Sequence, residues 1–373
     1  MFKKQIDFMA IGDITTDAFI RLKEAETHCN VNKEDCELCM PFGDKIPFEY
    51  VKVVKAVGNA ANAAVAAARL GLYSGLISNI GDDQNGKDCL AELQHNKVVT
   101  SSVQVHSGKP TNYHFVLWYE ADRTILVNHI EYDYRLPVGR LAGSPPKWIY
   151  LTSLAANSHA YHGAIADYLE ANPSVKLAFQ PGTFQMESGY ERLKRIYART
   201  EVFIVNKEEA ERILKTAIII SPTFSPSSAD DSPREPRRTP PVKFLGGVSA
   251  AVSEKVGGIK QLLKNLAALG PKIAIITDST AGAYMFDGDH YYHMPSYPDP
   301  RPAFDRTGCG DAFASTFVAA LAMGKTPLEA LLWAPVNPMS VAQFVGSREG
   351  LLSREQIEWW LSRAPENYRP REI

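Results

Sequence analysis

Apolar and polar positions follow two different periods along this chain. In some segments apolar residues recur at the spacing of a helix, for example in an Ala-rich segment at residues 60–69 and in residues 311–323. Short apolar runs of the kind that form buried strands occur at residues 8–11, 73–80, 148–151, 176–179, 202–205 and 273–277. Because strands alternate with helices, we predict an α/β fold with a mostly parallel central sheet and helices on both faces.

Three stretches break this alternation. Residues 18–55 and 110–130 contain short β-rich pieces, and residues 113–127 have the pattern of a hairpin. The segment 221–241 is rich in proline, serine and mixed charges, so we expect a disordered insertion there. Outside these stretches the pattern is continuous, and we predict one main domain over residues 1–373.

The net charge and the lengths of the apolar runs argue against two classes of partner, nucleic acid and membranes. The formal net charge of -2 provides no general basic field, which argues against nucleic acid. No apolar run is long enough to cross a bilayer, and the amino terminus lacks the apolar core of a signal peptide, so we expect no membrane partner and a cytoplasmic location.

The segment Gly308-Cys309-Gly310-Asp311 directly precedes an apolar helical run. A helix that begins at these glycines would present the backbone N–H groups of residues 308–310 to an anion, with Asp311 in the first turn beside it. The alternative is an ordinary helix start in which Asp311 only complements the helix dipole.

Other motifs accompany this segment. Gly58-Asn59-Ala60-Ala61-Asn62 opens the Ala-rich helix, and Asn206 and Glu209 follow an apolar run. In a parallel sheet, polar residues at the strand ends gather on one rim, where ligands bind. We expect Thr152, Gln180, Asn206 and Thr277 along this rim.

Taken together, these motifs resemble the ribokinase-like carbohydrate and nucleoside kinases, the PfkB family, over nearly the whole chain. The resemblance implies a three-layer sandwich with a small β-lid formed by segments 18–55 and 110–130, which in relatives often forms a dimer contact. The matching motifs are Gly12 to Asp17, Val57 to Ala64, Gly81 to Gly86, Asn206 to Glu209 and Asp305 to Asp311.

The resemblance and the chemistry together predict an ATP-dependent kinase for a sugar or nucleoside. Asp311 is the expected general base, and the backbone of Gly308, Cys309 and Gly310 is the expected anion hole. Asn206 and Glu209 are expected to organise Mg²⁺ through water, although the same pair could be only a helix capping box. Nucleotide contacts are expected from Asn206, Thr277, Gly282 and Asn337, and acceptor contacts from Asp17, Gly58, Asn59 and Asn62.

Two residues depart from the family pattern. Val57 replaces a glycine beside the acceptor site, and Arg306 replaces a threonine near Asp305, where some relatives bind a monovalent cation. Pro335 and Pro338 interrupt the helix expected around Asn337. These departures keep open a second hypothesis, a ligand-binding protein on the same fold that has lost catalysis.

The lid segment also contains Cys29, Cys36 and Cys39 beside His28. Three thiolates and an imidazole could bind zinc, but the spacing is unusual, and reduced thiols in a packed lid are the preferred interpretation. A dinucleotide oxidoreductase and a P-loop kinase are disfavoured, because the chain has neither a G-x-G-x-x-G after its first strand nor a Walker A sequence.

Overall fold

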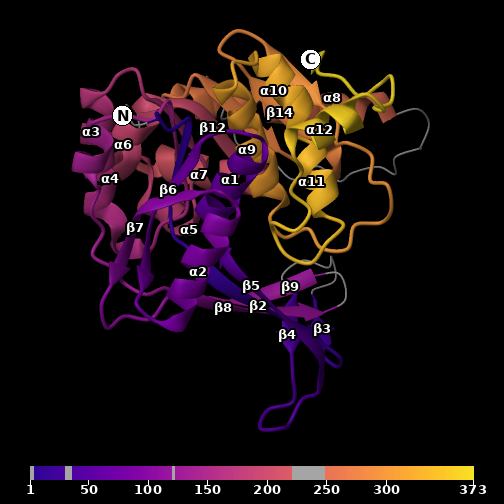
Figure 1. Ribbon diagram of the computed structural model, residues 1–373. Helices are drawn as coiled ribbons and strands as arrows, with labels where there is room; N and C mark the ends of the chain where they lie inside the picture. The colour runs from indigo at the N-terminus through magenta and orange to yellow at the C-terminus, as the bar shows by residue number, and fades with distance from the viewer. Residues whose placement is uncertain (1–3, 30–35, 120–121, 221–247) are drawn as a thin grey trace.

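The computed structural model describes residues 4–29, 36–119, 122–220 and 248–373. Its centre is a ten-stranded sheet (Figure 1). The strands in order across the sheet are β16 (Arg371–Glu372), β15 (Tyr291–Met294), β14 (Ala283–Phe286), β13 (Ile273–Thr277), β12 (Thr200–Asn206), β11 (Lys176–Phe179), β10 (Trp148–Leu151), β1 (Phe8–Ile11), β6 (Ser74–Gly81) and β7 (Val99–His106).

The strands from β13 to β7 pair in parallel, and β14, β15 and β16 add an antiparallel edge. The mostly parallel α/β sheet predicted from the alternating pattern is therefore confirmed. Because β10, β11, β12 and β13 are parallel neighbours, their carboxyl ends lie at one edge, as expected for a ligand-binding rim.

Helices cover both faces of the sheet, because successive strand side chains point to opposite sides. In β1, Phe8 and Ala10 pack into one core, whereas Met9 and Ile11 pack into the other. The first layer contains α1 (Asn59–Arg69), α2 (Gln84–His95), α9 (Cys309–Ala322), α10 (Pro327–Trp333), α11 (Val336–Val341) and α12 (Arg354–Leu361). The second layer contains α3 (Val138–Ala142), α4 (His159–Ala171), α5 (Thr183–Ser188), α6 (Tyr190–Arg199), α7 (Lys207–Ile220) and α8 (Val248–Ala268).

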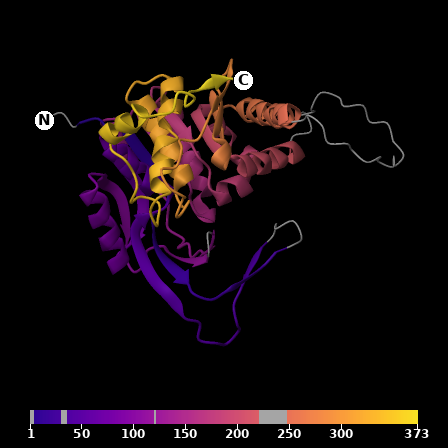
Figure 2. The ribbon, with the colours of Figure 1, turned by 90° about the vertical axis from the view of Figure 1, so that its right-hand side faces the viewer.

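A second sheet projects from one end of this body (Figure 2). We call it the lid sheet; it consists of β5 (Phe48–Val57), β2 (Thr15–Leu22), β8 (Tyr113–Tyr119) and β9 (Asp122–Leu126), in that order. The hairpin predicted at residues 113–127 is formed by the antiparallel pair β8 and β9. A cluster of Phe19, Val116 and Trp118 packs against Val345 of the body, so the lid sheet and the body share apolar contacts.

A short hairpin, β3 (Glu26–His28) and β4 (Glu37–Cys39), extends from the lid sheet. Cys29, directly after β3, and Cys36, directly before β4, form a disulfide, and Cys39 is free. Two of the three expected thiols are thus joined, which contradicts both a zinc site built from Cys29, Cys36 and Cys39 and the preferred interpretation of reduced thiols.

Two further expectations concern the remaining segments. The predicted insertion at residues 221–241 lies outside the described residues. Across the four described ranges, no helix combines the length and the apolar character needed to span a bilayer.

Candidate active site

Helix α9 begins where the sequence predicts, and the glycine at its N-cap explains why. Gly308 has a φ of 79°, a left-handed conformation that favours glycine. A Cβ atom there would lie 2.3 Å from the Cβ of Ser347, so the close packing of these two segments also requires glycine. The cap thus holds the start of α9 tightly against the loop that follows α11.

Asp311 lies in the first turn of α9, and its side chain is buried at the meeting point of three elements. Asn62 of α1 donates a hydrogen bond from Nδ2 to Asp311 Oδ2 at 2.8 Å, and Gln180, after β11, donates a longer one of 3.5 Å to Oδ1. Burial raises the pKa of Asp311 to about 6, with a further increase from the negative charge of Glu209, while Asn62 and Gln180 oppose the shift. Asp311 is therefore mostly ionised at neutral pH and close to the range in which it can exchange a proton.

The three backbone amides beside Asp311 are not equivalent. Within the described part of the chain, the N–H groups of Gly308 and Gly310 make no hydrogen bond, so both are available to an anion. The N–H of Cys309 donates to Arg306 O at 3.3 Å, so the expected contribution of Cys309 to an anion hole would require this bond to open. The Cys309 side chain is half-buried, and its desolvation raises the pKa of the thiol to about 12, so it remains protonated.

A pocket of about 220 Å³ opens directly beside this turn. It brings together Thr277 and Gly282, two of the expected nucleotide contacts, with Cys309 and Gly310 of the α9 turn. Arg306 also lines it, which puts a cationic side chain beside the expected phosphate site. Apolar walls come from Phe313, Pro335, Pro338, Met339 and Ala342, a lining suited to a flat ring.

Asn206 and Glu209 hold each other in a reciprocal capping arrangement. The backbone N–H of Asn206 donates to Glu209 Oε2 at 2.9 Å, and the N–H of Glu209 donates to Asn206 Oδ1 at 2.8 Å. Burial raises the pKa of Glu209, and its charge acts on Asp311, so the two carboxyl groups are close enough to interact. The capping role and an electrostatic role in the site therefore coexist.

The expected nucleotide contact by Asn337 is wrong. Its side chain is completely buried in α11, where Nδ2 donates to Thr316 and Oδ1 accepts from the N–H of Leu352. Both polar ends are thus used within the protein core. The neighbouring Pro338 and Met339 reach the pocket instead.

The carboxylate of Asp305 is already engaged. Its Oδ1 accepts from the N–H and the hydroxyl of Thr307, and its Oδ2 accepts from the N–H of Gly346 at 2.9 Å. Asp305 thus links its own loop, at Thr307, to the loop that contains Gly346. A monovalent cation near this residue stays a prediction.

Three of the expected acceptor residues, Gly58, Asn59 and Asn62, lie at the start of α1, where Asn62 contacts Asp311. Gly58 caps α1 with a φ of 97°, and a Cβ atom there would meet Asp13 O at 2.8 Å. Asn59 is the first residue of α1 and is half-buried, whereas Asn62, one turn later, bonds to both Asp311 and Ser347. Val57, the departure at this point, is a buried residue at the end of β5.

Asp17 lies in the lid sheet within a row of side chains that the sequence did not reveal. It is paired in register with His114 of β8, and its Oδ1 lies 3.4 Å from His114 Nδ1. The rings of His114 and His129 are 5.2 Å apart, and His129 contacts Phe184 at 5.6 Å. Asp17 Oδ1, His114 Nε2 and His129 Nδ1 are all buried and make no hydrogen bond to a described residue, although Asp17 Oδ1 is within ion-pair distance of His114 Nδ1.

Sequence reasoning also missed the role of Asp13 in bracing the rim. Tyr134 donates its hydroxyl to Asp13 at 2.8 Å, and the N–H of Ala155 donates to the same carboxylate at 2.8 Å. Burial raises the pKa of Asp13 to about 6. Its position four residues before Asp17 was visible in the sequence, but its partners lie more than a hundred residues away.

Known proteins resemble this chain in sequence and in structure. It is 25% identical to ribokinase of Bacillus subtilis over 82% of this chain and 87% of that protein. It is 24% identical to an ATP-dependent 6-phosphofructokinase of Thermoanaerobacterium thermosaccharolyticum over 72% of this chain and 73% of that protein. The structure of Arabidopsis thaliana ribokinase complexed with ribose and ATP matches with a TM-score of 0.71 at 16% identity, covering 96% of this chain and 99% of that one.

The family model for pfkB family carbohydrate kinases matches residues 52–336, which is more than half of the chain and includes the α1 turn, Asn206 and the α9 turn. The fold, the motif order and this match agree. The chain belongs to the pfkB family of carbohydrate kinases.

Proposed function

We propose that this protein transfers the γ-phosphoryl group of ATP to a hydroxyl of a sugar or sugar-like acceptor, with Asp311 as the general base. The observation that carries the proposal is the position of Asp311, a buried carboxylate next to two backbone amides that make no hydrogen bond to a described residue, in a helix turn whose residues Cys309 and Gly310 line a pocket. ATP-dependent phosphorylation of a carbohydrate is the activity typical of the family to which the chain belongs.

The chemistry needs few groups. The acceptor hydroxyl oxygen forms a bond to the γ-phosphorus, the bond to the bridging oxygen breaks, ADP leaves, and Asp311 takes the hydroxyl proton. The free N–H groups of Gly308 and Gly310 are suited to stabilise the charge on the transferring group, at the positive end of α9. Asn62 would keep the Asp311 carboxylate aimed at the hydroxyl through its 2.8 Å hydrogen bond.

The nucleotide would occupy the pocket lined by Thr277, Gly282 and Arg306. Glu209 and Asn206 have the oxygen donors that Mg²⁺ prefers, and they would hold the ion through its waters, where it would neutralise phosphate charge. Glu209 Oε1 is not used in the capping pair, so it supports this assignment.

The acceptor would lie between Asp311 and the lid sheet. Asp17 and Asn62 have the hydrogen-bonding groups to hold neighbouring hydroxyls, and the Phe184 ring would cover an apolar sugar face. His114 and His129 would add one hydrogen bond each. In this proposal the chain is one kinase domain with the lid sheet closing the acceptor site, while Gly58 and Asn59 shape its floor.

Three finer points stay predictions. A nucleoside could replace the sugar, a homodimer could form through exposed lid residues such as Val51, Val53 and Phe115, and the cytoplasm is the expected location. The sequence relatives named above act on different sugars by their names, so they leave the acceptor open.

The test is a panel of pentoses, hexoses, sugar acids, sugar phosphates and nucleosides with ATP and Mg²⁺, read by ADP release. We expect turnover with at least one acceptor, and a loss of about 10³-fold or more in kcat for Asp311→Asn with binding retained. Asp167→Asn, an exposed carboxylate paired with Arg195, is the matched control and should retain full activity. Equal turnover by Asp311→Asn and wild type would overturn the role of Asp311, and binding without turnover would favour the non-catalytic hypothesis.

A further inference from the structure

The lid sheet and the body are connected by four segments of the chain, residues 12–14, 58, 107–112 and 127–137. Asn112, at the end of the third segment, is 1% exposed, and its side chain bonds to the first and the fourth. Buried hydrogen bonds are electrostatically stronger than exposed ones, so a single side chain holds three of the four connections together.

Both polar ends of the Asn112 side chain are used. Nδ2 donates to Ile14 O at 3.0 Å, and Oδ1 accepts from the N–H of Ile130 at 2.8 Å; we call these two bonds the Asn112 bridge. The backbone oxygen of Asn112 also accepts from the N–H of Thr16 at 3.1 Å, where the parallel pairing of β2 with β8 begins. The bridge requires an amide, because an aspartate would offer two acceptors and a leucine neither a donor nor an acceptor.

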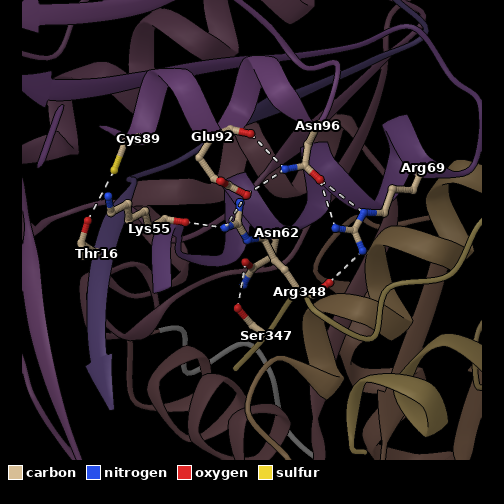
Figure 3. Close-up of polar contacts among 9 residues, drawn as sticks. All are labelled: Thr16, Lys55, Asn62, Arg69, Cys89, Glu92, Asn96, Ser347 and Arg348. Carbon is tan, nitrogen blue, oxygen red and sulfur yellow. Dashed lines mark hydrogen bonds and ion pairs between the residues drawn. The ribbon is translucent and has the colours of Figure 1, made fainter. Parts of the chain in front are cut away.

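The body holds the same connections through helix α2. Asp83, the N-cap of α2, accepts from the hydroxyl of Thr111 at 2.6 Å and from its N–H at 3.0 Å. The hydroxyl of Thr16 lies 3.5 Å from the thiol of Cys89 in the same helix (Figure 3). The Asn112 bridge therefore joins segments that are fixed to the body at two points of one helix.

The bonds of Asn112 lie next to the polar side chains that the lid sheet contributes to the proposed acceptor site. Asn112 bonds to the residue before Asp17 and to the residue after His129. His114 lies two residues after Asn112 in the chain. Asp17 Oδ1 is 3.4 Å from His114 Nδ1, and the rings of His114 and His129 are 5.2 Å apart. A shift of one connection would therefore change how these three side chains face one another.

We propose that Asn112 is a positioning residue for the acceptor, which aligns Asp17, His114 and His129 without contacting the substrate. Among the described residues, none that lines the nucleotide pocket belongs to the four connections. Acceptor binding should therefore depend on Asn112, whereas nucleotide binding should not. This inference rests on the proposed function, because the acceptor site is part of it.

The test is the KM of Asn112→Asp for each substrate, with an acceptor that the panel identifies. The variant keeps the shape of the side chain and an oxygen for the N–H of Ile130, but it places a second oxygen against Ile14 O. Because a misplacement of about 1 Å in a binding group can cost up to about 100-fold, we expect the acceptor KM to rise roughly tenfold or more at about pH 8, and the KM for ATP to stay within about twofold.

The same variant offers a rescue by pH. Burial raises the pKa of a carboxyl group introduced at this position, and its protonated form can donate to Ile14 O as the amide does. The ratio of the acceptor KM of Asn112→Asp to that of wild type should therefore fall as the pH is lowered from about 8 to about 6. The ratio is taken at each pH because Asp13 and Asp311 also titrate near pH 6. Loss of stability alone would not give this recovery in the acceptor KM.

Two further variants complete the set. Asn172→Asp is the matched control, because Asn172 also donates to a backbone oxygen, that of Tyr168, but lies at the end of α4. It should leave both KM values unchanged. Thr111→Val removes the hydroxyl bond to Asp83 and should raise the acceptor KM several-fold, so it tests the positioning even if Asn112→Asp does not fold.

Hydrogen exchange of the backbone amides needs no turnover. The amides of Thr16 and Ile130 should exchange faster in Asn112→Asp than in wild type, and at the wild-type rate in Asn172→Asp. Absence of turnover in the wild type would contradict the proposed function and not the bridge, which the exchange rates still decide. An unchanged acceptor KM, an equal rise in both KM values, a KM ratio independent of pH, or equal exchange in wild type and Asn112→Asp would overturn the role of Asn112.

Discussion

Asn62 donates a 2.8 Å hydrogen bond to the carboxylate of Asp311, a residue 249 positions later in the chain. The bond joins the first turn of α1 to the first turn of α9, and helix packing between α1 and α9 holds the two turns together. It also opposes the effect of burial on the pKa of Asp311. The ionisation of the proposed base therefore depends on a residue of the proposed acceptor site.

The first prediction concerns the pH dependence of turnover. Burial raises the pKa of Asp311 to about 6, and the base must be ionised to accept a proton, so kcat should be constant above about pH 7 and fall about tenfold per pH unit below about pH 6. The measurement is a pH profile of kcat with an acceptor that the panel identifies. A profile that stays flat down to about pH 4.5 would contradict the shifted pKa.

The second prediction tests the role of Asn62. Asn62→Ala removes a hydrogen bond that favours the charged form of Asp311, so the pKa of Asp311 should rise further. The acid limb of kcat should move upward by about one pH unit or more, since such bonds contribute roughly 1.5–3 kcal/mol. Asn96→Ala, which changes a partly buried amide without contact to Asp311, should leave the limb in place. Because Asp13 also titrates near pH 6, an unmoved limb in Asn62→Ala would point to Asp13 instead.

The third prediction concerns stability. The pKa of Asp311 is raised from its ordinary 3.8 to about 6 in the folded state, so between these values the folded protein binds more protons than the unfolded chain. The stability that this carboxyl contributes is complete below about pH 3.8 and is lost as the pH rises through about 6.

Asp311→Asn removes the titrating group while keeping an oxygen that can accept from Asn62. The variant should be more stable than wild type by roughly 1–3 kcal/mol at pH 7.5, and the difference should shrink as the pH falls below about 6. Urea unfolding at several pH values measures both. If the difference in unfolding free energy between Asp311→Asn and wild type is independent of pH, the pKa of Asp311 is not shifted in the folded state.

The fourth prediction compares two glycines. Gly308 and Gly324 have similar left-handed φ values of 79° and 87°, but a Cβ at Gly308 would overlap Ser347, whereas a Cβ at Gly324 would meet open space. Gly324→Ala should cost about 1 kcal/mol of unfolding free energy from backbone strain alone. Gly308→Ala should cost several kcal/mol and abolish turnover, because the start of α9 must shift. Similar losses in the two variants would mean that the loop of Ser347 yields at little cost.

Much of the candidate site followed from local patterns. Gly308 had to begin a helix because an apolar run of helical period follows it, and Asn206 and Glu209 had the spacing of a capping pair, which the structure contains. The Asn337 prediction failed because a motif position does not state which way a side chain points, and α11 turns it into the core. His114 was invisible for another reason: its parallel pairing with Asp17 joins β2 and β8 across about a hundred residues of chain.

By itself, the sequence determined the kinds and order of elements, the family and the turns that bear the motifs, because periodicity, glycine and capping residues act over a few neighbours. Only the tertiary structure decided which distant groups meet: Asp311 with Asn62, and Asp13 with Tyr134. Burial and contact between distant segments control these outcomes, and both are properties of the packed chain as a whole.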